Sequence, residues 1–185
     1  MFYVCYFLHC LKNSMLDTEL PDLTIPGVIN GEIVNISLHS YSGKPLVLVF
    51  YPYDFSFICP KEINDFSDNI VEFEKLECNV VLVSCDSVYS HIIWSMISRE
   101  ERGIRGVKYP MIADYNKDLT KALNLCTPRG NSERATVIVD AHLQIKHISM
   151  VDINYERSID EILRLIKAMV FVEKYGEVCY VDWGN

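Results

Sequence analysis

The chain has 185 residues, of which 50% are hydrophobic and 23% charged, the composition of one globular domain with a sizeable core. The 8 glycines and 7 prolines are too few for a fibrous or low-complexity protein, and the net charge of -8 argues against nucleic acid as a main partner, because phosphate binding depends on clustered Lys and Arg. The 7 cysteines contain no Cys-x-x-Cys pair, which excludes a zinc knuckle or dithiol site of that spacing and indicates mostly free thiols in a reducing compartment.

Residues 2–8 form an apolar run that is far shorter than the ~20 residues needed to cross a membrane. A secretory signal would have basic residues before this run and small residues after it, and both are missing. We therefore predict a cytoplasmic protein without a membrane partner. We assign residues 1–16 to an N-terminal extension, either an extra edge strand or the result of a start upstream of Met15, and residues 17–185 to one domain.

Strands and helices alternate from Leu20 onward. Residues 33–38 and 46–51 are predicted strands, and the second is apolar throughout, which is typical of a strand buried on both faces. A helix is predicted from Pro60, because proline suits the first helical turn. Its apolar residues recur on one stripe: Ile63, Phe66, Ile70, Phe73 and Leu76.

The second half of the chain continues this alternation. The predicted elements are a strand at 80–83, helices at 89–100 and 116–123, and strands at 135–139 and 145–149. The last helix opens at Ser158, which forms a predicted capping box with Glu161. This order indicates an α/β fold with a central mixed β-sheet flanked by helices.

Cys59 follows the apolar strand directly and opens the helix behind it. Unpaired N–H groups and the macrodipole at a helix N-terminus stabilise an anion, which favours a thiolate there. Ser56, one turn earlier, can donate its hydroxyl to the sulfur or to a substrate oxygen, and Pro52 stiffens the loop and shields the thiolate. From this placement alone, a reactive Cys59 and a buried structural thiol remain equal alternatives.

The segment from Pro52 to Glu62 resembles the active-site signature of the peroxiredoxins, in which a proline, then Thr or Ser, precede a cysteine that is followed by Pro and Glu. Further blocks agree in order along the chain: residues 83–87, 90–91 and Trp94, 109–114, 134–140, 157–161, and 176–179 with Trp183. The last block is specific for the typical 2-Cys subgroup, which includes thioredoxin peroxidases and bacterial alkyl hydroperoxide reductase subunits.

This resemblance implies a thioredoxin-like fold and thiol-dependent reduction of hydrogen peroxide and organic hydroperoxides, in antioxidant defence and redox homeostasis. Cys59 matches the peroxidatic cysteine, which becomes a sulfenic acid. Arg134 matches the arginine that stabilises both thiolate and peroxide. Ser56 and Pro52 stand where the family has Thr or Ser and proline.

The remaining matches concern support and recycling. Glu62 and Arg157 match a pair that orients Arg134. Cys179 matches the resolving cysteine, which forms a disulfide with the sulfenic acid across a homodimer interface, and higher ring oligomers occur in the family. The resemblance implies a thioredoxin-like protein reductant and no metal, haem or flavin.

The sequence also departs from the family pattern. Tyr180 replaces the usual proline after Cys179, and the loop at 152–156 lacks the usual proline and glycine, which bears on the position of Arg157. The family's glycine-rich loop appears as Arg102–Gly106, and the chain stops soon after Trp183. We therefore expect rapid disulfide formation and resistance to overoxidation of Cys59.

The sequence offers no chemical role for the remaining cysteines of the domain or for two residues of the predicted helix at 89–100. Two functions other than peroxidase also remain open. Cys78, Cys85, Cys126, His91 and Trp94 are interpreted as packing residues. One alternative function is a peroxide sensor or thiol relay with a protein client, and the other is a chaperone-like oligomer in which catalysis is secondary.

Overall fold

The computed structural model describes residues 14–176, 178 and 179. Within them, one mixed sheet has seven strands in the order β2-β1-β5-β4-β3-β6-β7. Strands β3, β4 and β5 pair in parallel, and the other neighbours pair antiparallel. The strands are β1 Thr24–Ile29, β2 Glu32–Ser37, β3 Leu46–Phe50, β4 Asn79–Ser84, β5 Met111–Ala113, β6 Arg134–Val139 and β7 Ile145–Val151.

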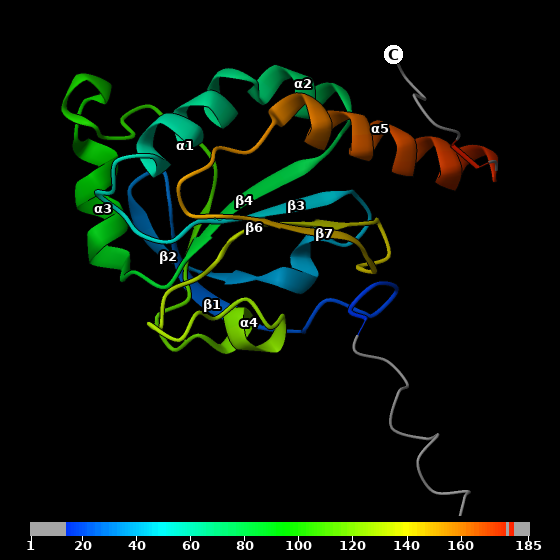
Figure 1. The fold of residues 1–185 in the computed structure, drawn as a ribbon, viewed down its shortest axis with the longest axis horizontal. Coiled ribbons are helices and arrows are strands. Elements are labelled where there is room, and N and C mark those ends of the chain that lie inside the picture. Colours follow the sequence, from blue (N-terminus) through cyan, green and yellow to red (C-terminus); the bar gives the residue numbers. More distant parts are fainter. Residues whose placement is uncertain (1–13, 177, 180–185) are drawn as a thin grey trace, which may run out of the picture.

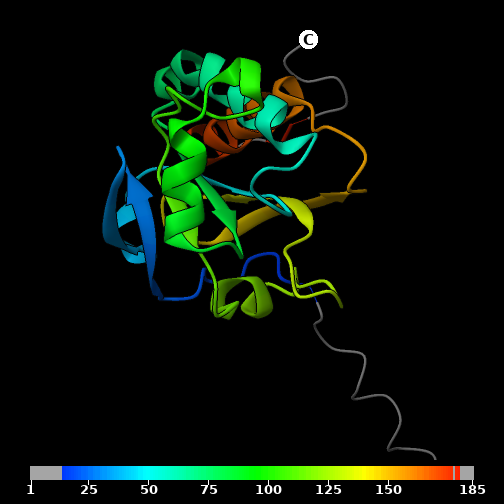
Figure 2. The same ribbon diagram turned by 90° about the vertical axis from the view of Figure 1, so that its left-hand side faces the viewer.

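The helices cover both faces of this sheet. They are α1 Cys59–Asp68, α2 Ile70–Lys75, α3 Val88–Met96, α4 Asp118–Ala122 and α5 Ile159–Tyr175, with 3-10 turns η1 Leu38–Tyr41 and η2 Arg99–Glu101. Helices α1, α2 and α5 lie over one face and α4 under the other (Figure 1). The β1–β2 hairpin forms one edge, beyond α3 (Figure 2). In the described part of the chain, no helix combines the length and the hydrophobicity that a membrane span requires.

Two apolar cores lie on the two faces, and β3 belongs to both. Leu46, Leu48 and Phe50 pack on the face that α4 covers. The alternate residues Val47 and Val49 pack beneath α1, α2 and α5. Side chains of a strand point to opposite faces in turn, so a strand buried on both sides must be apolar throughout. The predicted α/β architecture with a mixed sheet is confirmed.

Two helix predictions differ from the structure: one helix is shorter than predicted, and another is divided into two. The predicted helix at 89–100 ends at Met96, because Ile97 is extended and Ser98 caps the separate turn η2. The stripe that begins at Ile63 runs over two helices, since Asn69 interrupts the helical geometry between α1 and α2.

The sequence patterns also missed two strands, and only one of the two hydrogen bonds of the predicted capping box is present. Strand β1 contains Pro26 and Gly27, and β5 has only three residues, so neither carries a strong strand signal. At the start of α5, the Ser158 hydroxyl accepts a hydrogen bond from the Glu161 amide as predicted. The Glu161 carboxylate, however, pairs with Arg164.

Candidate active site

Cys59 lies in the loop-to-helix junction at the carboxyl end of β3. Its side chain is fully buried, and it is the first residue of α1. The Ser56 hydroxyl oxygen accepts a hydrogen bond from the Cys59 backbone N–H at 3.4 Å. Because a hydroxyl can accept and donate at the same time, its proton stays available to the sulfur or to a ligand.

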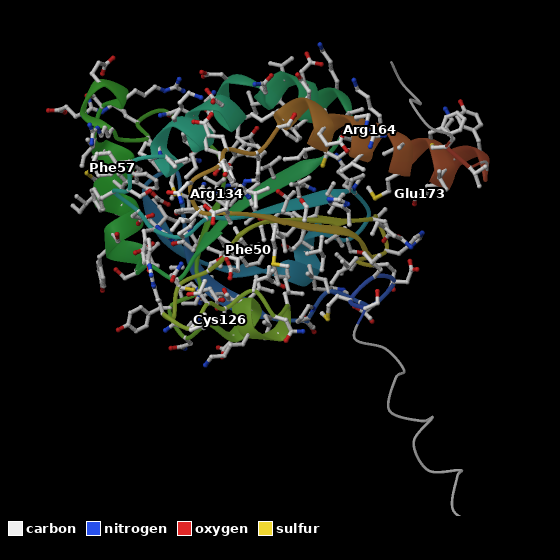
Figure 3. All side chains as sticks on the ribbon, in the orientation of Figure 1. Phe50, Phe57, Cys126, Arg134, Arg164 and Glu173 are labelled. Carbon is white, nitrogen blue, oxygen red and sulfur yellow. The ribbon has the colours of Figure 1, made fainter. Side chains whose placement is uncertain are left out.

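Strand pairing brings Arg134 to this junction. Phe50 at the end of β3 pairs with Ala135 in β6, so the preceding residue, Arg134, lies next to the loop that follows β3. Its Nη2 lies 3.5 Å from the Cys59 Sγ and donates to the Ile153 carbonyl at 3.1 Å. Figure 3 shows Arg134 between the sheet and the layer of α1 and α5.

A buried carboxylate holds two arginines in place. Glu62, in the first turn of α1, accepts two hydrogen bonds of 2.8 Å from the Arg157 guanidinium and one from the Arg134 Nη1. Burial by itself would raise the pKa of Glu62, but the hydrogen bonds and charge of Arg157, with the charge of Arg134, lower it below its ordinary value. Two guanidinium groups against one carboxylate leave one net positive charge beside Cys59.

The unusual loop at 152–156 does not displace Arg157. Besides the two bonds to Glu62, its Nη1 donates to the Ala135 carbonyl at 2.6 Å, and its backbone N–H donates to Glu62 at 3.1 Å. The loop itself is held by Asp152, which accepts from the Asn154 backbone N–H at 2.9 Å. Sequence departures in this loop therefore leave the Glu62 cluster complete.

A cavity of about 180 Å³ opens beside the buried sulfur. Its lining comes from the loop before Cys59, from Arg134 and from the loop after β7: Pro52, Tyr53, Ser56, Phe57, Ile58, Cys59, Arg134, Ile153 and Asn154. Among the described residues, the Arg134 Nε is buried without a hydrogen-bond partner. A buried N–H without a partner is costly, so the site favours a small ligand that carries an oxygen acceptor.

Cys179 lies against α5, away from the cavity beside Cys59. Its Sγ is 3.7 Å from the Ala168 carbonyl of α5, in a cavity of about 410 Å³ that Lys146 and Glu173 also line. Figure 3 shows Glu173 and Arg134 well apart along the long axis of the molecule. The fold thus gathers Pro52, Ser56, Cys59, Glu62, Arg134 and Arg157, and it does not bring Cys179 of the same chain to Cys59.

Arg102–Gly106, the loop that replaces the family's glycine-rich motif, contacts the active-site loop. The Arg102 guanidinium lies over the Phe57 ring, 4.4 Å from its centre. Gly103 packs so closely on the Ile97 backbone that a Cβ would lie 2.1 Å from its carbonyl oxygen. Residues 180–185 lie outside the described residues, so resistance to overoxidation stays a prediction.

Sequence reasoning missed one polar contact in this region. His91, expected to be a packing residue, is fully buried, but its Nδ1 lies 2.8 Å from the Asp54 carboxylate. The signal was present in the motif, because Asp54 is the one acidic residue between Pro52 and Cys59. Trp94, which is also buried, packs against Tyr51 as expected, and its indole N–H donates to the Arg102 carbonyl.

Comparison with known proteins identifies the fold and the family. Residues 16–148 match the AhpC/TSA family. The chain belongs to this family. Peroxiredoxin 1 of Brugia malayi is 42% identical over 90% of this chain and 74% of its own length. The putative thioredoxin peroxidase of Encephalitozoon cuniculi is also 42% identical, over 91% of this chain and 96% of its own.

Solved structures agree with this assignment. The reduced 2-Cys peroxiredoxin of Plasmodium vivax superposes with a TM-score of 0.89 at 31% identity, covering 93% of this chain and 91% of that one. The predictions of a 2-Cys peroxiredoxin and of a thioredoxin-like fold are thereby confirmed. The family match covers residues 16–148 and assigns no role to single residues. The following roles therefore remain predictions: those of Pro52, Ser56, Cys59, Glu62, Arg134, Arg157 and Cys179.

Proposed function

We propose that this protein is a thiol-dependent peroxidase that reduces hydrogen peroxide and organic hydroperoxides at Cys59, in antioxidant defence. The observation that supports this best is the placement of the buried Cys59 sulfur 3.5 Å from Arg134 beside a small cavity. The relatives named peroxiredoxin and thioredoxin peroxidase support the same activity.

The first step uses the thiolate as a nucleophile. A lone pair of the Cys59 sulfur attacks the terminal peroxide oxygen, the S–O bond forms and the O–O bond breaks. The leaving oxygen takes a proton and departs as water or an alcohol, and Cys59 becomes a sulfenic acid. Arg134 stabilises the thiolate and the negative charge that develops on the leaving oxygen, and the Ser56 hydroxyl orients the peroxide.

The second step regenerates the thiol. Cys179 of a second chain attacks the sulfenic sulfur, water leaves, and a disulfide joins the two chains of a homodimer. A dithiol protein of the thioredoxin type then reduces this disulfide by exchange. Larger rings of such dimers are compatible with this scheme, and the scheme needs no metal or organic cofactor. Because free thiols must be regenerated in each cycle, we propose that the protein works in a reducing compartment such as the cytoplasm.

A coupled turnover assay tests this function. Purified protein is supplied with thioredoxin, thioredoxin reductase and NADPH, and loss of NADPH is followed after addition of peroxide. We expect rapid loss that disappears in Cys59→Ser and persists in Cys78→Ser, a matched control at another buried cysteine. Oxidation of Cys59 without turnover would instead support a peroxide sensor, and prevention of client aggregation by Cys59→Ser would support a chaperone.

A further inference from the structure

The loop between β3 and α1, residues 51–58, is anchored near its middle by Asp54. The side chain of Asp54 is 1% exposed, and one carboxylate oxygen accepts from the Tyr51 hydroxyl at 2.8 Å. The other carboxylate oxygen lies 2.8 Å from the His91 Nδ1. The Asp54 backbone N–H donates to the Asp86 carboxylate at 3.0 Å. Asp54 therefore ties the loop to Tyr51 directly after β3, to α3 and to the segment after β4.

His91 faces oxygen acceptors on both sides of its ring. Its Nδ1 faces Asp54, and its Nε2 lies 3.3 Å from the Ile112 carbonyl of β5. A neutral imidazole has a single N–H, so only the doubly protonated ring donates to both acceptors. The contact with Asp54 is fully buried, and the Asp86 carboxyl group lies beside it, since it accepts from the Asp54 backbone N–H.

The loop that this pair anchors has an unfavourable backbone conformation. Phe55, directly after Asp54, has φ of 57°, in the left-handed region that side chains other than glycine rarely adopt. The turn at Phe55 lies between Pro52 and Ser56, which both line the cavity at Cys59. Contacts around Asp54 must hold this conformation, because the chain would otherwise relax.

We infer that Asp54 and His91 form a positioning pair that holds the loop in the arrangement in which Cys59 reacts with peroxide. This inference rests on the proposed function. The Cys59 sulfur is fully buried, whereas a disulfide requires an S–S distance of about 2.05 Å, so the loop must open before any second thiol can reach it. The pair opposes this opening; it favours the peroxide step and slows the disulfide step.

Two conservative variants weaken the contacts of the pair. In Asp54→Asn, the amide can donate to a neutral His91 whose Nε2–H still donates to Ile112, so folding is preserved. Tyr51→Phe removes the hydroxyl that donates to Asp54 and that also lies 3.5 Å from the His91 Nδ1. Loss of one such bond corresponds to about a tenfold change in the opening equilibrium.

Three measurements on each variant separate positioning from general damage. Amide hydrogen exchange of residues 52–59 in the reduced protein is expected to be about tenfold faster, as the lost bond implies. Stopped-flow reaction of Cys59 with hydrogen peroxide is expected to slow, and subsequent disulfide formation to speed up. A merely structural defect would slow both chemical steps.

A double-mutant cycle tests whether the two residues act as one unit. His91→Gln alone removes the ring that contacts both Asp54 and the Ile112 carbonyl and should open the loop the most. In the Asp54→Asn background, the same substitution should change loop exchange by less than about twofold, because the partners are already uncoupled. If the double variant instead changed loop exchange by the product of the two single-variant effects, the two residues would act independently and the inference of a pair would be wrong.

Tyr109→Phe serves as the matched control, since it removes a buried hydrogen bond of 3.0 Å to the Phe66 carbonyl, near the far end of α1 from Cys59. It should leave loop exchange and both chemical steps unchanged. The inference is overturned if Asp54→Asn and Tyr51→Phe also leave loop exchange unchanged, or if they slow both chemical steps. Hydrogen exchange needs no peroxide, so it decides this inference even if the wild-type protein reduces no peroxide and the proposed function fails.

Discussion

The guanidinium of Arg134 lies 3.5 Å from the sulfur of Cys59, and both side chains are buried. Little solvent screens the charge of Arg134 at the sulfur, because both groups lie inside the protein. The Glu62 carboxylate holds the same guanidinium from the other side. The reactivity of Cys59 is therefore expected to depend on Arg134, and the position of Arg134 on Glu62.

Arg134→Lys is expected to lower the rate constant of Cys59 with hydrogen peroxide by about 10²- to 10³-fold, the loss typical for one preorganised donor. Lysine keeps the charge but lacks the planar fork that reaches Glu62, Ile153 and Cys59 together. Stopped-flow kinetics measures this rate. Arg99→Lys, in an exposed ion pair with Asp68, is the matched control and should react like wild type.

The Ser56 hydroxyl accepts from the Cys59 amide and has a proton left to donate. Ser56→Ala is expected to slow the peroxide reaction by about tenfold, as loss of one hydrogen bond to a charged group implies. Ser56→Thr keeps the hydroxyl and should retain most of the rate. Equal rates in the alanine and serine proteins would show that the hydroxyl takes no part.

Cys179 is expected to resolve the sulfenic acid between two chains, because the fold keeps it against α5, away from Cys59 of its own chain. Peroxide should convert the protein to a disulfide-linked dimer on a non-reducing gel, and Cys179→Ser should stay monomeric on the same gel. Cys126→Ser, at another half-buried thiol, should dimerise normally. A dimer formed by Cys179→Ser would exclude this role.

Glu62 carries a pH dependence of stability. Its pKa is lowered in the folded protein, so its carboxylate stabilises the fold above about pH 4.3, the ordinary value, and this contribution is lost as the pH falls through the lowered pKa. Glu62→Gln breaks a buried ion cluster and is expected to cost about 3–5 kcal/mol at pH 7.

Urea unfolding between pH 3 and pH 7 measures this contribution. The free energy of unfolding should fall more steeply with acid in the wild type than in Glu62→Gln. Glu77→Gln removes an exposed carboxylate that lies 3.6 Å from the Lys44 Nζ and should keep the wild-type slope. Parallel slopes for the wild type and Glu62→Gln would mean that the buried carboxylate does not titrate in this range.

Cys78 is expected to be inert in the native protein. Burial raises its pKa to about 12, so its thiolate is scarce at pH 8. Iodoacetamide at pH 8 followed by peptide mass spectrometry should label Cys78 slowly in buffer and rapidly in urea. Rapid labelling in buffer would show that this part of the core opens readily.

The sequence by itself determined the local features of this protein. The apolar run at 46–51 required a strand covered on both faces, and Cys59 directly after it had to open a helix near Pro60. These features depend on neighbouring residues, which is why periodicity and capping chemistry were sufficient to predict them. The family motifs added the order of the functional residues along the chain.

Only the tertiary structure decided which distant side chains meet. Arg134 reaches Cys59 because β6 pairs antiparallel with β3 in one register, and a shift of one residue would turn it to the other face. The contact of Asp54 with His91 likewise depends on where α3 packs, and the pattern of α3 alone made that histidine a packing residue. Such contacts join residues far apart in sequence, so no local periodicity records them.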